Sequence, residues 1–222
     1  MKIQELTLLT NNLSKTKEFY LHKIGLEIIE ETKTKVAFNV GISKLIFEQT
    51  NIDKKPKYHF ALNIPSNKID EAKNWALQRV NLISMDNSFI ANFENWNAKA
   101  IYFFDNNKNI VELISRTDLN NESEIPFSEK AILSINEIGL VIDKPLKTAN
   151  EIIQKFKTGY FSKGPKREDF VAVGNDEGLF VISNPNRNWY PTNESAEKWS
   201  VKAKFKIAEN EKFYAFLDIY PS

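Results

Sequence analysis

The chain has 222 residues, with 30 Lys and Arg against 29 Asp and Glu, so its formal net charge at pH 7 is +1. This balance lacks the basic excess that attracts a phosphate backbone, and we therefore expect no nucleic-acid partner. Cysteine is absent, which excludes thiolate zinc sites, iron–sulfur clusters, cysteine nucleophiles and disulfides, and fits the cytoplasm. The N-terminus has neither the apolar stretch of a signal peptide nor that of a membrane span, so we expect a mature, soluble protein without a membrane partner.

Residues 1–50 predict one strand, one helix and three further strands. KIQELTLLT (2–10) alternates apolar and polar residues, as a strand does. A helix follows in residues 11–25, with Ser14 as its N-cap and Gly25 as its stop. Short strands then fit LEIIEET (26–32), KVAFNV (35–40) and KLIFEQT (44–50). This order of elements defines a βαβββ module.

The same order returns in residues 58–116, after a short polar linker. YHFALNI (58–64) predicts the first strand, and SNKIDEAKNWALQR (66–79) predicts the helix. The remaining predicted strands lie near Phe89–Glu94 and in AIYFFD (100–105) and NIVELIS (109–115). Residues 1–116 therefore divide into two modules, at 1–50 and 58–116.

A third copy occupies residues 134–222, after a linker at 117–133. Its predicted elements are a strand in ILSINEIGLVI (132–142), a helix in PLKTANEIIQKFK (145–157), and strands in DFVAVG (169–174) and GLFVISN (178–184). A C-terminal extension follows them. The repeat predicts an α+β protein built from βαβββ modules.

The first strands of the three modules share a pattern that marks a candidate site. They align without gaps as ELTLL (5–9), HFALN (59–63) and EIGLV (137–141). Glu5, His59 and Glu137 open them, and residues two apart share one face of a strand. These faces are less apolar than the opposite faces, as the inside of a ligand-holding cup would be. Polar residues also begin many strands, so a purely structural interpretation stays open.

These stretches resemble the vicinal oxygen chelate superfamily, which includes glyoxalase I, extradiol dioxygenases, and fosfomycin- and bleomycin-resistance proteins. The resemblance rests on ELTLLTNNLSKTKEFYLHKIGLEII (5–29), HFALNIPSNKIDEAKNWA (59–76) and IYFFDNNKNIVELIS (101–115). FVAVGNDEGLFVISNPNRNWYPTN (170–193) resembles an additional C-terminal module of some members. The resemblance implies that the modules at 1–50 and 58–116 pair into a curved-sheet cup around a divalent metal, with the third module appended.

Transferred one residue at a time, the resemblance places metal ligands at Glu5, His59 and Glu112. It gives Glu5 a second role as catalytic base, and Glu48 is the other candidate base. Many relatives have His where Glu5 stands, and the remaining histidine, His22, falls on the first predicted helix. An intact dioxygenase site of two His and one carboxylate is therefore disfavoured. Two carboxylates and one imidazole suit Zn²⁺, Mn²⁺, Ni²⁺ or Fe²⁺.

The resemblance implies a metal-dependent enzyme of the lyase or isomerase type that acts on a small substrate with two neighbouring oxygens. The metal would stabilise an oxyanion while a carboxylate moves a proton. The alternative is a binding protein without chemistry, like the bleomycin-resistance members. In that case His59 would be a hydrogen-bonded pocket residue, and aromatic residues such as Tyr102 and Phe103 would line the cup.

The third module has an ambiguous role in the sequence. Glu137 opens its first strand, but its last predicted strand, 178–184, supplies no carboxylate to match Glu112. We therefore expect this module to pack against the other two or to form a homodimer interface. The loop NPNRNWYPTN (184–193) is interpreted as a lid or substrate clamp, or as a plain turn held by its prolines.

Overall fold

The computed structural model describes residues 1–85, 87–207 and 215–219. Its helical elements are α1 (Leu13–Glu18), η1 (Phe19–Ile24), α2 (Ile69–Leu77), η2 (Glu94–Trp96), η3 (Thr117–Leu119), η4 (Glu129–Ala131) and α3 (Pro145–Phe156). Its strands are β1 (Lys2–Thr10), β2 (Ile28–Glu31), β3 (Lys35–Val40), β4 (Ser43–Gln49), β5 (His59–Ile64), β6 (Ala91–Phe93), β7 (Ala98–Phe104), β8 (Ile110–Arg116), β9 (Ser134–Val141), β10 (Phe170–Asn175), β11 (Gly178–Ser183), β12 (Val201–Lys206) and β13 (Ala215–Ile219).

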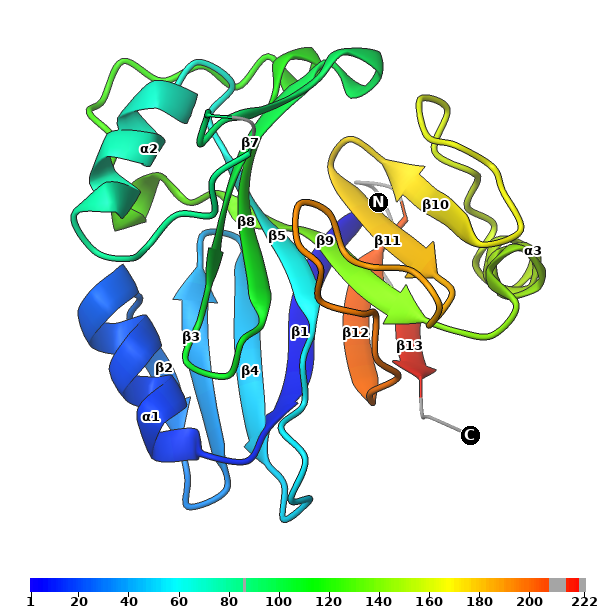
Figure 1. Ribbon diagram of the computed structural model, residues 1–222, viewed down its shortest axis with the longest axis horizontal. Helices are drawn as coiled ribbons and strands as arrows, with labels where there is room; N and C mark the ends of the chain where they lie inside the picture. Colours follow the sequence, from blue (N-terminus) through cyan, green and yellow to red (C-terminus); the bar gives the residue numbers. More distant parts are fainter. Residues whose placement is uncertain (86, 208–214, 220–222) are drawn as a thin grey trace.

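The α+β class is confirmed; the first two copies have the βαβββ order, and the third has two strands, β10 and β11, after its helix. In each copy the first strand runs parallel to the last, as β1 does to β4, β5 to β8 and β9 to β11. The helix of each copy follows the first strand and forms part of the long connection that a parallel pair requires. Figure 1 shows the three helices α1, α2 and α3 at the outside of the sheet.

The first helix begins and ends with residues that suit these positions. Asn12, rather than Ser14, is the N-cap, because its side chain accepts a hydrogen bond from the backbone N–H of Lys15 at 3.0 Å. The helix continues as the π-helical turn η1 and stops at Gly25, whose φ of +87° is open to glycine at little cost. Its buried face carries Phe19, Tyr20 and Ile24.

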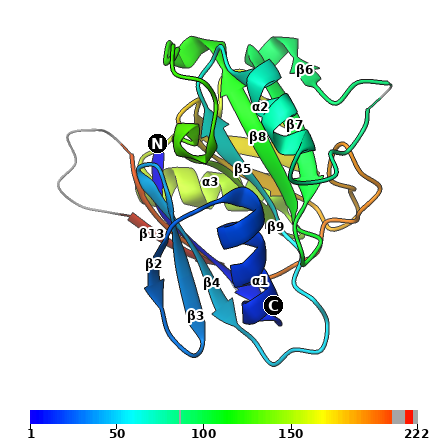
Figure 2. The same ribbon diagram turned by 90° about the vertical axis from the view of Figure 1, so that its left-hand side faces the viewer.

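The modules do not pair as the resemblance implied. β5 runs antiparallel to β9 of the third module, whereas β1 runs antiparallel to β12 of the C-terminal extension. β1 and β9 share a single bridged pair, Ile3 with Ile135. The second and third modules therefore form the paired unit, and β12 and β13 extend the sheet of the first module (Figures 1 and 2). The backbone groups at a strand edge can pair with a strand of any sequence. The alternation of apolar and polar residues therefore does not by itself determine which strand lies next to it.

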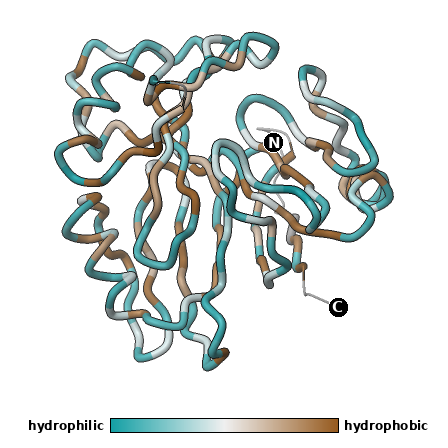
Figure 3. The backbone as a smooth tube through the Cα atoms, viewed as in Figure 1, coloured by the Kyte–Doolittle hydropathy of each residue, from teal (hydrophilic) through white to brown (hydrophobic). Residues whose placement is uncertain are grey.

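One continuous hydrophobic core joins all three modules. It includes Leu6 of β1, Phe60 of β5, Ile138 of β9 and Phe205 of β12, each at most 1% exposed. Burying such a side chain stabilises the fold by about 1.5–3 kcal/mol. Figure 3 shows hydrophobic stretches along the strands and hydrophilic stretches in the loops and along the helices. Of the helices in the described ranges, none has the length and apolar character needed to cross a membrane.

Candidate metal centre

Three adjacent strands bring an imidazole and two carboxylates together. His59 lies on β5, Glu112 on β8 and Glu137 on β9, and one ligand atom from each lies within 4.8 Å of the others. All three residues are buried, with exposed fractions of 6%, 3% and 3%. They form a group whose donor atoms could hold a divalent metal ion.

Strand register explains this convergence. Ala61 of β5 lies opposite Glu112 on one side and opposite Glu137 on the other. The two carboxylates therefore flank a small side chain in one row across the sheet, and the methyl group of Ala61 leaves space between them. His59 precedes Ala61 by two residues, so its ring points to the same face.

His59 is held as a neutral imidazole. Its Nδ1 lies 3.3 Å from the carbonyl oxygen of Ile110, which only accepts hydrogen bonds, so Nδ1 carries the proton. Nε2 then presents a lone pair, 3.5 Å from a Glu112 oxygen. Burial lowers the pKa of His59 to about 4, so the ring is neutral near pH 7.

Burial shifts both carboxyl groups toward their neutral, protonated forms. Burial, and then the charge of Glu137, raise the pKa of Glu112 well above its ordinary value, although Tyr102 donates a hydrogen bond to it. Burial also raises the pKa of Glu137, against the opposing effect of Arg116. A positive charge placed between these carboxyl groups would reverse the shifts.

Arg116 is a component of the site that the sequence interpretation missed. It is fully buried and donates to Glu137, while its Nε lies 2.9 Å from Asn136 Oδ1. Its guanidinium lies 5.5 Å from the Trp96 ring and 5.6 Å from the Phe161 ring. A signal was present, since Arg116 follows Glu112 by four residues and alternation places both on one face of β8.

A pocket of about 260 Å³ opens onto these groups. Aromatic residues form much of its wall, namely Phe93, Trp96, Tyr102, Phe170, Trp189 and Tyr190. Trp189 and Tyr190 come from the 184–193 loop, so this loop lies at the site. The Trp189 ring lies 5.1 Å from the His59 ring, and the Tyr190 ring lies 6.0 Å from that of Tyr102. The loop therefore covers the side of the pocket next to His59.

The absence of a side chain at Gly139 makes room for the Trp189 ring. A Cβ at Gly139 would lie 2.7 Å from two carbons of the Trp189 ring. Gly139→Ala should push the ring away from His59, lower the free energy of unfolding by about 1–3 kcal/mol and change tryptophan emission. Urea unfolding followed by fluorescence would measure both effects. Gly159→Ala is the control, because a Cβ there meets nothing within 4 Å. Equal results for both variants would contradict the role of this contact.

Glu5 lies outside the group formed by His59, Glu112 and Glu137. Its Oε1 lies 3.2 Å from Lys204 Nζ and 3.8 Å from Lys44 Nζ, so lysines of β12 and β4 offset its charge. The antiparallel neighbour of β5 is β9 and not β1, which is why Glu137 stands where Glu5 was expected.

Glu48 and His22 also lie apart from this group. Glu48 is paired with Lys202, whose Nζ lies 3.0 Å from Glu48 Oε2. Both Glu48 and Glu5 thus face cations of the sheet formed by β4, β1 and β12. His22 is exposed on η1, in agreement with its position on the predicted helix.

Only the second module supplies a carboxylate at the position of Glu112. By strand register, the corresponding residues are Ile46 on β4 and Val181 on β11. Neither side chain can bind a metal. A complete group therefore needs the second module together with a neighbouring first strand.

The comparison with protein-family models gave no match. A metallothiol transferase FosB from Staphylococcus haemolyticus is 31% identical over 117 residues, which cover 50% of this chain and 81% of the relative. This similarity shows that the chain belongs to the vicinal oxygen chelate superfamily, the class of glyoxalases, bleomycin-resistance proteins and related dioxygenases.

The chain is also similar to solved structures. A "putative dioxygenase" from Bacillus subtilis aligns with a TM-score of 0.60 and 15% identity, over 82% of this chain. The chain spans 63% of the length of that protein. Lactoylglutathione lyase from Agrobacterium tumefaciens aligns with a TM-score of 0.42 and 19% identity, over 51% of this chain and 92% of its own length.

Proposed function

We propose that the chain is a divalent-metal-dependent enzyme of the lyase or isomerase type, acting on a small molecule with two neighbouring oxygens. The observation that carries the proposal is the buried group of His59, Glu112 and Glu137, whose ligand atoms lie within 4.8 Å of one another at a pocket of about 260 Å³. Buried charges of like sign are costly unless a cation compensates them, and such a group in a cleft is typical of functional sites.

The residues fit a divalent metal. One imidazole and two carboxylates form a donor set that suits Zn²⁺, Mn²⁺, Ni²⁺ and Fe²⁺ alike. Nδ1 of His59 donates to a backbone carbonyl, which is the usual second contact of a metal-bound histidine. Arg116 donates to one oxygen of Glu137, and the carboxylate has a second oxygen for a metal.

A bound divalent ion would polarise a substrate oxygen as a Lewis acid. The chain's own residues prepare the site for this chemistry. Burial raises the pKa of Glu112, which favours the protonated carboxyl group while no cation is bound. Tyr102 donates a hydrogen bond to that carboxyl group and orients it. Trp189, which is 7% exposed, covers one face of His59 and excludes water from it.

Metal titration of the purified protein tests this proposal. After chelator treatment, we expect one Zn²⁺, Mn²⁺, Ni²⁺ or Fe²⁺ to bind per chain. Binding should release protons, because Glu112 must ionise to become a ligand. Calorimetry in two buffers of different ionisation enthalpy would measure the released protons. The loaded protein would then be screened for turnover of diketones, thiohemiacetals and catechols. Absence of binding to all four metals would overturn the proposal.

A second function, small-molecule binding without turnover, is favoured by Arg116. This cation already offsets the charge of Glu137, and the pocket wall is rich in aromatic rings. Such a pocket can hold a flat apolar ligand without metal. In that case ligands would bind equally to the chelator-treated and the metal-loaded protein, and no product would form.

A further inference from the structure

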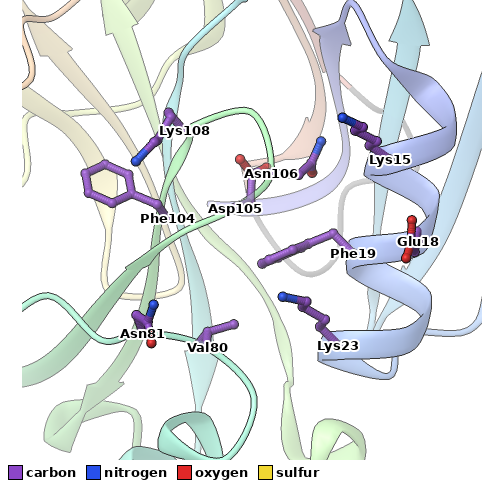
Figure 4. A pocket seen from close by; sticks show the side chains of 10 residues that line it. All are labelled: Lys15, Glu18, Phe19, Lys23, Val80, Asn81, Phe104, Asp105, Asn106 and Lys108. Atoms are coloured by element: carbon purple, nitrogen blue, oxygen red, sulfur yellow. The ribbon is translucent and has the colours of Figure 1, made fainter.

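A second cavity lies between the first and second modules. Its volume is about 560 Å³, and it shares no lining residue with the pocket at the metal centre. Figure 4 shows α1 and η1 on one side, and the turn between β7 and β8 on the other. Residues 80 and 81, which follow α2, close the lower edge in that view.

Three lysines give this cavity a positive character. Lys15, Lys23 and Lys108 are exposed, and none of them forms an ion pair with any residue of the described ranges. Figure 4 shows Lys15 and Lys23 extending from the helix toward the turn. By contrast Lys17, on the same helix, lies 2.8 Å from Glu31. Ammonium groups at a cavity, without an ion-pair partner among the described residues, attract anions.

The two carboxyl groups of the cavity do not neutralise the lysines directly. Glu18 is exposed, and Figure 4 shows its side chain along the helix and not toward the turn. Asp105 is buried and accepts hydrogen bonds from the Tyr20 hydroxyl at 2.7 Å, from the Asn109 side chain at 2.7 Å and from the Asn107 N–H at 2.8 Å. Its oxygens are therefore committed to the turn.

These bonds also fix the position of Lys108. Asp105 ties down both neighbours of Lys108, and the backbone of Lys108 adopts a φ of +69°. This conformation is uncommon for a residue other than glycine, asparagine or aspartate. The Lys108 ammonium lies 4.9 Å from the centre of the Phe104 ring. A rigid turn thus presents a cation next to an aromatic surface.

The cavity also offers apolar and polar contacts. Phe19 and Phe104 provide aromatic surface, and the Lys23 ammonium lies 6.0 Å from the Phe19 ring centre. Within the described residues, Oδ1 of Asn106 is buried and accepts no hydrogen bond. The amide nitrogen of the same side chain, Nδ2, donates a hydrogen bond to Thr16 Oγ1. The cavity wall therefore holds a buried acceptor without a partner among the described residues.

We propose that this cavity binds an aromatic organic anion that carries a carboxylate or a phosphate. Lys15, Lys23 and Lys108 pair with the anionic group, while Phe19 and Phe104 pack against the ring. The site is separate from the metal centre, so its occupation requires neither His59 nor a metal.

Fluorescence titration with anilinonaphthalene sulfonate, an aromatic anion, tests the proposal on the full chain. We expect one probe molecule per chain. The triple variant Lys15→Gln, Lys23→Gln, Lys108→Gln should bind it about tenfold more weakly, because three charge contacts are lost. The matched control changes to glutamine three other exposed lysines that form no ion pair within the described residues, Lys55, Lys99 and Lys144, and it has the same net charge. Circular dichroism would show that both variants are folded.

The outcomes separate this site from the metal centre and identify the anionic group. Retained probe binding in His59→Ala supports the proposal, whereas its loss there would overturn it. Equal weakening in the two triple variants would also overturn it, since net charge alone would then explain the binding. Displacement by naphthoate or by naphthyl phosphate supports the proposal, and the tighter competitor names the anion. Displacement only by uncharged naphthyl methanol would contradict it.

Discussion

Glu137→Gln is expected to abolish metal binding, whereas Glu5→Gln should bind metal as the unchanged protein does. Glu137 lies with His59 and Glu112 in the buried group, while Glu5 is paired with Lys204 and Lys44. Loss of one metal-coordinating side chain should weaken metal affinity by more than about 100-fold. Even residues that only hydrogen-bond to a coordinating side chain change metal affinity by about 10–100-fold. Metal content by mass spectrometry, after reconstitution of protein purified without a His-tag, measures this.

Two further variants complete this experiment. His59→Ala should lose the metal as Glu137→Gln does, and Glu48→Gln should keep it, since Glu48 is paired with Lys202. All variants would be checked for thermal unfolding, because a misfolded protein also loses metal. If Glu5→Gln lost the metal while Glu137→Gln kept it, the site would belong to the first module, and the assignment of Glu137 would be wrong.

Arg116→Met is expected to lower the free energy of unfolding by about 3–5 kcal/mol, because it leaves the Glu137 carboxylate buried without its partner. Arg116 is fully buried, and Glu137 is 3% exposed. Urea unfolding at neutral pH would measure the loss. The double variant Arg116→Met, Glu137→Gln should recover part of it, since the unpaired charge is then absent.

The control for this prediction is an ion pair at the surface. Lys17→Met removes the partner of Glu31, in a pair whose side chains are 38% and 46% exposed. Solvent screens such a pair, so the change should lie within about 1 kcal/mol. A loss for Arg116→Met no larger than for Lys17→Met would show that Glu137 takes up a proton or finds another donor, and that Arg116 does not stabilise the site.

Local patterns predicted the module and most of its elements. The strand 2–10, the helix 145–157 and the strand 178–184 lie within a residue of β1, α3 and β11. Each is defined by neighbours in sequence, through alternation, helical periodicity or Pro145 at the first turn. The helix expected at 66–79 is shorter, at Ile69–Leu77, with Lys68 at its N-cap. Helix ends depend on capping contacts, which the sequence indicates less strongly.

Of the three metal ligands expected from the sequence, two lie together in the structure and Glu5 does not. His59 and Glu112 lie together, and Glu137 was recognised at the head of its strand. Glu137 lacked a matching carboxylate in its own module, which suggested a packing role. In the structure the second carboxylate comes from Glu112 of the second module, because β5 lies between β8 and β9 and brings Glu112 close to Glu137.

By itself, the sequence determined the βαβββ repeat, the strand faces and the positions at which ionisable residues open the first strands, because these follow from contacts between near neighbours. Only the tertiary structure decided which strands meet. β5 pairs with β9 and β1 pairs with β12 through backbone hydrogen bonds, which form with any side chains. That pairing separated Glu5 from His59 and placed Glu137 beside Arg116. It also placed Trp189 over His59, since the loop that carries it follows β11, the parallel partner of β9.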